Sequence, residues 1–250
     1  MTNKSIEKVN KEVLNIRDEK SLMNFLSEPT VKIAEALTGI LASDEKDWKL
    51  SAGKLVQSAI KGNLLTQLGR EIKKYQEEGK IKEDYFATYR ARASLFELLK
   101  FLEEEVPDEE LFSAIKSIYF YGVSIDSTAQ DEFWSYEFLQ VAKKISGAEV
   151  LIMKACYEIK NGEYSEGVYD RLAKNISISS RAVWRNLISL QMNLEGVDSV
   201  VQKYEENLES LGLISPRSED NRFSNEFVPV EKQRLTEMGN KFCEFMMRYE

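Results

Sequence analysis

Apolar residues recur every three or four positions along most of this chain, which is the spacing of amphipathic helices. The predicted helices span residues 3–26 (one helix or two short ones), 30–41, 51–75 (one long helix or several short ones), 85–102, 107–120, 131–144, 148–157, 172–190, 197–211 and 235–246. One stretch departs from this spacing: Leu213 and Ile214 precede a polar insert, and Phe227 to Val230 follow it. The pattern predicts a mostly α protein with one small β-hairpin between about 212 and 231.

A change of composition at Gly147 suggests a domain boundary. A chain of 250 residues is long enough for one or two domains. We therefore expect a helical domain over residues 1–146 and a second domain over residues 147–250.

The end of the second domain carries two apolar motifs on either side of its polar insert. They are LESLGLI (208 to 214) and LTEMGNKFCEFM (235 to 246). This order resembles the winged-helix fold, in which a helix runs into the first strand of a wing and a closing segment returns to a helix. With the helical part from about 51 to 160, the chain also resembles the bacterial Abi-alpha proteins of abortive infection. The resemblance implies a winged-helix-like domain over 147–250 and an accessory role in phage defence.

A winged helix usually reads DNA with the helix that precedes the wing, here residues 197–211. The positions that we expect to be exposed on it carry one cation and four anions: Asp198, Lys203, Glu205, Glu206 and Glu209. Such a face repels phosphate, which disfavours DNA as the partner of this helix.

A competing interpretation takes residues 169–190 as a helix-turn-helix. A short basic and polar set would then face the DNA groove: Ser179, Ser180, Arg181, Arg185 and Asn186. The simpler alternative is that Arg181 and Arg185, one turn apart, form a solvated helix face.

Charge and composition narrow the function classes further. The net charge is −8, from 34 basic and 42 acidic residues, and neither predicted domain is basic, whereas nucleic-acid affinity depends largely on phosphate neutralisation. The chain contains no histidine, which excludes Ser/His/Asp and Cys/His catalysis and histidine-bearing zinc sites. Glycine-rich phosphate loops are also absent, so we expect no catalytic residues, no metal site and no cofactor.

One enzymatic alternative stays open. Magnesium nucleases pair an aspartate with a Glu-x-Lys motif, and Asp108 with Glu158 and Lys160 fits the letters of that pattern. Both motifs fall in helical periodicity, so a metal-dependent nuclease ranks third.

Aromatic residues gather between positions 119 and 138, where they could line a ligand pocket. Packing between two adjacent helices explains them with nothing added. We therefore expect core positions for Tyr119, Phe120, Tyr121, Phe133, Trp134, Tyr136 and Phe138.

Cys156 and Cys243 lie in apolar helical patterns without a C-x-x-C spacing, so we expect reduced core thiols. No signal peptide is seen, and the apolar runs are shorter than the roughly 20 residues of a membrane span, so we expect a cytoplasmic protein without a membrane partner. The sequence favours a non-catalytic protein-interaction or regulatory protein whose partner is another protein or a second copy. A DNA-binding regulator is the alternative.

Overall fold

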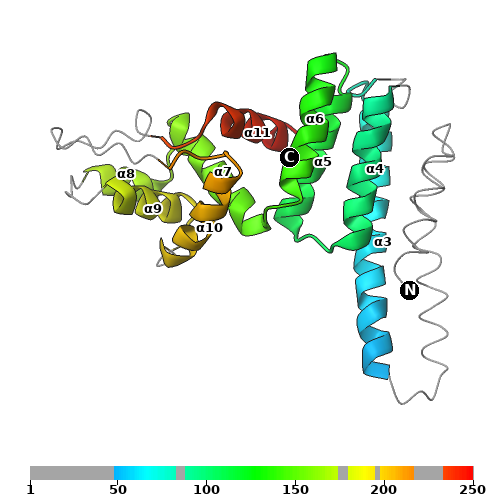
Figure 1. The fold of residues 1–250 in the computed structure, drawn as a ribbon, viewed down its shortest axis with the longest axis horizontal. Helices are drawn as coiled ribbons and strands as arrows, with labels where there is room; N and C mark the ends of the chain where they lie inside the picture. The colour runs from blue at the N-terminus through cyan, green and yellow to red at the C-terminus, as the bar shows by residue number, and fades with distance from the viewer. Residues whose placement is uncertain (1–47, 83–87, 174–179, 195–197, 217–232, 250) are drawn as a thin grey trace. The chain divides into compact units, whose positions relative to one another are not determined.

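The computed structural model of this chain describes residues 48–82, 88–173, 180–194, 198–216 and 233–249 (Figure 1). Its helices are α3 (Trp48–Glu77), α4 (Tyr89–Glu104), α5 (Glu109–Val123), α6 (Ala129–Ala142), α7 (Gly147–Lys160), α8 (Glu166–Ala173), α9 (Ser180–Gln191), α10 (Asp198–Ser210) and α11 (Glu237–Met247). Two isolated antiparallel bridges, Ile81 with Ser124 and Ile214 with Leu235, are the β-structure of the described residues. The mostly α prediction is confirmed for these residues. The helices predicted over 3–26 and 30–41 and the strand predicted at 227–230 lie outside them.

The chain divides into two compact units, which interleave along the sequence. The described residues of unit 1 come from positions up to Asp108, from Ile115–Gln140 and from Tyr249, and those of unit 2 from Glu109–Ala114 and Val141–Arg248. The domain boundary that the sequence suggests after residue 146 stays a prediction.

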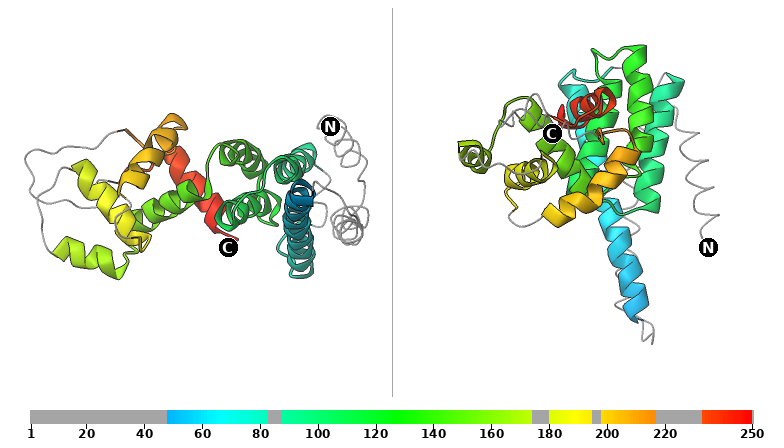
Figure 2. Two further views of the ribbon diagram at one scale, coloured as in Figure 1. Left: turned by 90° about the horizontal axis from the view of Figure 1, so that it is seen from below. Right: turned by 60° about the vertical axis from the view of Figure 1, so that its left-hand side comes forward.

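Unit 1 is a bundle in which successive helices lie side by side and run in opposite directions (Figures 1 and 2). Its fully buried side chains include Leu68 and Ile72 of α3, Leu95 of α4, and Phe120 of α5. The helices α5 and α6 approach closely at Gly122, where a Cβ atom would lie 2.5 Å from Cβ and Oγ of Ser135. Ser135 completes this contact by donating its hydroxyl proton to the Ile118 carbonyl at 2.9 Å.

Helix α7 is the centre of unit 2, where it packs against α9, α10 and α11. Its first turn is fixed by a capping box, because the Ser146 side chain accepts the Glu149 N–H while the Glu149 carboxylate accepts the Ser146 N–H. The second carboxylate oxygen of Glu149 accepts from Asn207 Nδ2 of α10 at 2.6 Å. One side chain thus caps α7 and joins it to α10.

The start of α11 differs from the sequence prediction, which included Leu235 in the last helix. Thr236 is the N-cap, since its hydroxyl accepts the Gly239 N–H at 2.9 Å, and Leu235 pairs with Ile214 in the extended bridge. Gly239 lies directly against the backbone of Leu213, because a Cβ atom at position 239 would be 1.9 Å from the Leu213 carbonyl oxygen.

The helix predicted over 172–190 also differs, because two helices, α8 and α9, occupy this region. Ser165 directly precedes α8 and ties it to the end of α9, because its N–H donates to Gln191 Oε1 and its hydroxyl to the Leu190 carbonyl.

Candidate functional site

The residues of the helix-turn-helix interpretation lie at the start of α9. Ser179 is outside the described residues, and Ser180 and Arg181 open the helix with side chains that are also outside the description. Arg185 and Asn186 have described side chains, and that of Arg185 is only 19% exposed. The Nε of Arg185 donates to Glu205 Oε2 of α10 at 2.8 Å. A DNA phosphate would have to compete with this carboxylate.

The structure corrects the expected exposure of Glu205, whose side chain is 3% exposed. Its position explains the burial, because Val201 and Leu208, four residues before and three after it, lie on the same face of α10 and are buried. A carboxylate in the apolar face of an amphipathic helix signals a buried partner. This signal was available in the sequence.

That partner is Arg234, which precedes α11 and is 2% exposed. Its two terminal nitrogens donate to Glu205 and Glu209, and its Nε donates to the Ser215 carbonyl at 2.9 Å. With Arg185, these residues form a network of two guanidinium groups and two carboxylates. The contacts of this network hold α9, α10 and the segment before α11 together. Because its charges balance internally, the network presents no net charge to an anion.

Two of the three residues of the nuclease pattern, Glu158 and Lys160, are engaged in contacts within unit 2, whereas Asp108 belongs to unit 1. Glu158 accepts from Gln191 Nε2 at 2.7 Å, and Lys160 donates to Asn240. In the part of the chain that the structure describes, no group of three or more acidic or cysteine residues is arranged to hold a metal ion.

Cys156 and Cys243 are free thiols, and both are fully buried. Burial raises the pKa of Cys156 to about 12, while nearby Arg234 lowers it by a smaller amount. Burial also raises the pKa of Cys243 well above its usual value. Thiolates at such sites are scarce, so neither cysteine is suited to nucleophilic chemistry.

Aromatic side chains are exposed in unit 1. Tyr89, in the first turn of α4, is 81% exposed, and Phe133 of α6 is 42% exposed. Phe133 therefore departs from the core position expected for it, whereas Tyr119, Phe120 and Phe138 are buried as predicted.

The spacing along α6 explains this difference. Trp134 and Phe138 are four residues apart and stack with ring centroids 5.2 Å apart, which places them on one side of the helix. Phe133 and Tyr136, three residues apart, lie on another side. A helix with aromatics on two faces cannot bury all of them against one neighbour, and this was the sequence signal that an aromatic residue such as Phe133 would be exposed.

We use the term aromatic face for Tyr89, Arg90, Phe133 and Tyr136, which come from α4 and α6. The Arg90 guanidinium lies over the Phe133 ring, 5.6 Å from its centroid. Burial raises the pKa of Tyr136, and the charges of Glu97, Glu137 and Tyr89 raise it further. The groups whose charges act on Tyr136 are thus another phenol and two carboxylates, while the Arg90 guanidinium lies beside Phe133.

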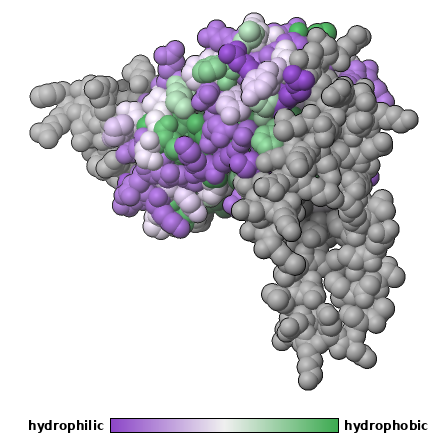
Figure 3. Space-filling model, turned by 45° about the vertical axis from the view of Figure 1, so that its right-hand side comes forward, coloured by the Kyte–Doolittle hydropathy of each residue, from purple (hydrophilic) through white to green (hydrophobic). Residues whose placement is uncertain are grey.

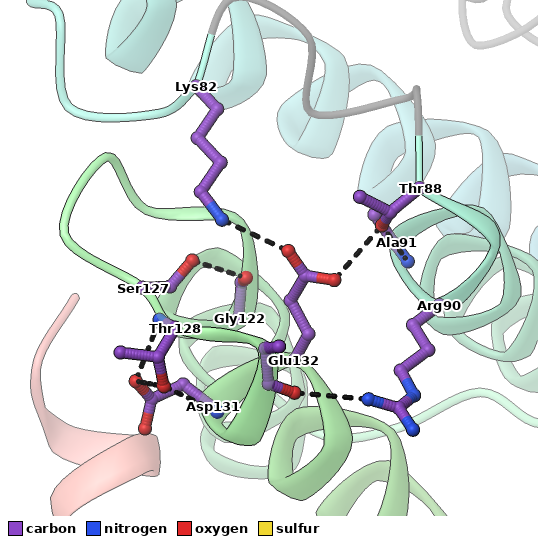
Figure 4. A network of polar contacts seen from close by, with 10 residues as sticks. Lys82, Thr88, Arg90, Ala91, Gly122, Ser127, Thr128, Asp131 and Glu132 are labelled. Carbon is purple, nitrogen blue, oxygen red and sulfur yellow. Dashed lines mark hydrogen bonds and ion pairs between the residues drawn. The ribbon is translucent and has the colours of Figure 1, made fainter.

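Polar contacts fix the two helix starts that carry this face (Figure 4). The buried Glu132 carboxylate accepts from Lys82 Nζ and from Thr88 Oγ1, each at 3.0 Å. Thr88 also caps α4 by accepting the Ala91 N–H. Arg90 Nη1 donates to the Ala129 carbonyl at 3.2 Å, so the first turns of α4 and α6 are joined directly.

Composition suits this face to macromolecular contact. Tyrosine, phenylalanine and arginine are enriched at protein interfaces, and tyrosine and arginine often dominate the binding energy.

The coloured surface drawn in Figure 3 is mainly hydrophilic with small hydrophobic patches. None of the helices within the described ranges has the length and apolar character to cross a membrane.

Comparison of this chain with protein-family models, with curated proteins and with solved structures finds no match.

Proposed function

We propose that this chain is a non-catalytic protein-interaction protein with a regulatory role. The observation that carries the proposal is the aromatic face, because it exposes Tyr89 and Phe133 on a part of unit 1 that Glu132 and Arg90 hold in place. Preorganised aromatic side chains lose little entropy on binding, so they contribute more affinity than mobile ones.

The resemblance to winged-helix and Abi-alpha proteins adds a biological setting to this proposal. The bridge between Ile214 and Leu235 joins the segment after α10 to the segment before α11, as at the base of a wing. This bridge supports the winged-helix-like second domain, and the role as a cytoplasmic, bacterial phage-defence accessory protein rests on the resemblance alone.

A DNA-binding regulator is the second candidate, since α8 and α9 fit the order of a helix-turn-helix. The contacts of Arg185 weigh against it. A cation that neutralises DNA phosphate contributes to affinity through its free charge, and the charge of Arg185 is paired with a buried carboxylate.

Two measurements on purified protein test the proposal. Fluorescence anisotropy with labelled duplex DNA should show at most weak binding near 0.15 M salt, and Arg181→Glu should leave it unchanged. The chain used as bait should capture a protein whose binding is then reproduced with purified components and lost in Tyr89→Ser/Phe133→Ser. Tight, salt-dependent DNA binding lost in Arg181→Glu would make the DNA regulator the correct assignment.

A further inference from the structure

Helix α7 ends in a backbone motif that requires glycine. The Gly162 N–H donates to the Ile159 carbonyl at 3.1 Å, and the Glu163 N–H donates to the Glu158 carbonyl at 2.9 Å. These two bonds define a Schellman motif, in which the residue after the C-cap adopts the left-handed conformation. Gly162 has a φ of 77°, which a residue with a side chain rarely adopts. The C-cap, Asn161, is therefore followed by a glycine.

The resulting Asn-Gly pair is the dipeptide most prone to deamidation, and it occurs once in the sequence. In this reaction the backbone nitrogen after an asparagine attacks the side-chain Cγ, and a Cβ atom on the following residue hinders the attack. Glycine at 162 removes that hindrance. Asn161 is exposed, and a Cβ atom at position 162 would meet no atom within 4 Å, so water has access to the pair.

We propose that Asn161 is a deamidation site of the folded chain and that its conversion loosens the junction between α7, α8 and α9. The Gly162 nitrogen loses its proton to water and bonds to Asn161 Cγ. The Cγ–Nδ2 bond then breaks, and ammonia leaves with a proton returned by the solvent. The product is a cyclic succinimide, which water opens at either of its carbonyl groups to give aspartate or isoaspartate. Overall the reaction consumes one water and releases one ammonia.

The native backbone controls the rate of this reaction. Asn161 has a ψ of 0°, whereas ring closure needs a rotation that turns the Gly162 nitrogen towards Cγ. The same rotation breaks the Schellman bonds, because the Gly162 N–H then points away from the Ile159 carbonyl. Deamidation therefore requires the end of α7 to open. Its rate in the folded chain is the rate in a free peptide multiplied by the open fraction.

Gln191 of α9 holds this turn closed. Its Nε2 donates to Glu158 Oε2 at 2.7 Å and to the Glu163 carbonyl at 3.0 Å, while its Oε1 accepts the Ser165 N–H at 2.8 Å. The contacts lie on both sides of Asn161 in the sequence. Isoaspartate adds a methylene to the main chain between them, so one carboxamide no longer reaches all three. Aspartate adds a negative charge at the end of α7 that is already partly negative.

Mass spectrometry of the whole purified chain, incubated near pH 8 and sampled over several weeks, tests the site. The chymotryptic peptide 158–164 should gain the mass of deamidation, and protein isoaspartate methyltransferase should label it. Asn193 is the internal control, because it is also exposed just after a helix but precedes a leucine. Conversion at Asn161 should be at least about tenfold faster, since glycine lacks the Cβ atom that hinders attack.

Three variants test the chemistry and its effect on the fold. Asn161→Gln should abolish the mass change, because the longer side chain closes its ring far more slowly. Gln191→Ala removes the contacts that keep the turn closed and should speed conversion about tenfold, towards the rate of a synthetic peptide 155–167. Asn161→Asp reproduces the aspartate product. Its urea midpoint should be lower than that of Asn161→Gln, which keeps the neutral carboxamide.

Each part of the proposal has a result that contradicts it. If Asn161 stays intact in the folded chain while the peptide is converted, it is not a deamidation site of the native protein. Equal conversion rates at Asn161 and Asn193 would show that the glycine has no effect. If Gln191→Ala and the wild-type chain react equally fast, Gln191 does not control the opening. Equal urea midpoints for Asn161→Asp and Asn161→Gln, with an unchanged midpoint for the isoaspartate product, would overturn the loosening of the junction.

Discussion

Arg234 and Glu205 form an ion pair in which both side chains are almost completely buried. The two residues are 29 positions apart, and the pair joins α10 to the segment before α11. Removing water from two charges is costly, so the contribution of such a pair to stability depends on both partners being present.

We expect Arg234→Met to lower the free energy of unfolding by about 3–5 kcal/mol, because it leaves the Glu205 and Glu209 carboxylates with less compensation. Urea titration followed by circular dichroism measures this change. The control is Lys203→Met on the exposed side of α10, for which we expect a change within about 0.5 kcal/mol. A loss below about 1 kcal/mol for Arg234→Met would mean that water solvates the carboxylates.

The same network predicts that Arg185→Glu destabilises the fold. The sequence analysis placed Arg185 in a DNA groove or on a solvated helix face, and both placements leave it exposed, but its Nε is bound to Glu205. A glutamate there would face a buried carboxylate. We expect a lower urea midpoint for Arg185→Glu than for Arg185→Gln, and equal midpoints would contradict the pairing.

Gly239→Ala should be one of the most damaging single-methyl additions in unit 2. The added Cβ would lie 1.9 Å from the Leu213 carbonyl oxygen, which belongs to the backbone and cannot rotate away. We expect a loss of about 3 kcal/mol or more in unfolding free energy. Gly167→Ala in α8 is the matched control, because its Cβ would be in ordinary contact, 3.4 Å from Leu190 Cδ2, and alanine favours helix by about 1 kcal/mol. Similar losses for both variants would refute the close approach.

Gly122 and Ser135 provide a double-mutant test of the contact between α5 and α6. Gly122→Ala should destabilise unit 1 because its Cβ would overlap the Ser135 side chain. In a Ser135→Gly background, where that side chain is gone, the same substitution should cost much less. Additive losses, measured by chemical denaturation, would show that the two positions do not interact.

Thiol reactivity provides a test of burial at Cys156. With a pKa of about 12, about one thiol in ten thousand is ionised at pH 8. We expect slow labelling of the native protein by a thiol reagent and fast labelling in urea. The raised pKa also makes the free energy of unfolding depend on pH. The contribution of the buried neutral thiol to stability is complete below pH 9, the ordinary pKa of this thiol, and declines as the pH rises towards 12. Cys156→Ala should flatten this decline, and an unchanged slope would contradict it.

Helical periodicity predicted most of the described helices, because each amphipathic face depends on residues only three or four positions apart. The predicted helix at 197–211 agrees with α10, Asp198–Ser210, for this reason. The start of α11 was harder to predict from the sequence, since it depends on the cap at Thr236 and on the pairing of Leu235 with Ile214 across a long insert.

The candidate site was harder to predict than the helices. The sequence suggested exposed positions for Glu205 and Arg185, whereas a partner distant in sequence, Arg234, decides their environment. The exposure of Tyr89 follows from its place in the first turn of α4, after the Thr88 cap, and periodicity alone could not distinguish that place from the buried face.

The pairing of Ser215 with Arg234 has a consequence for changes in chain length. The Ser215 N–H donates to the Arg234 carbonyl and Arg234 Nε donates to the Ser215 carbonyl, so the two ends of the segment 216–233 are held together by residues outside it. Once the two ends of a connecting segment are fixed, each doubling of its length costs only about 0.6 kcal/mol of closure entropy. Insertion of a peptide tag or a small domain between these two residues should therefore be tolerated better than insertion elsewhere in unit 2, and related chains could differ in length here while keeping the same helices around α7.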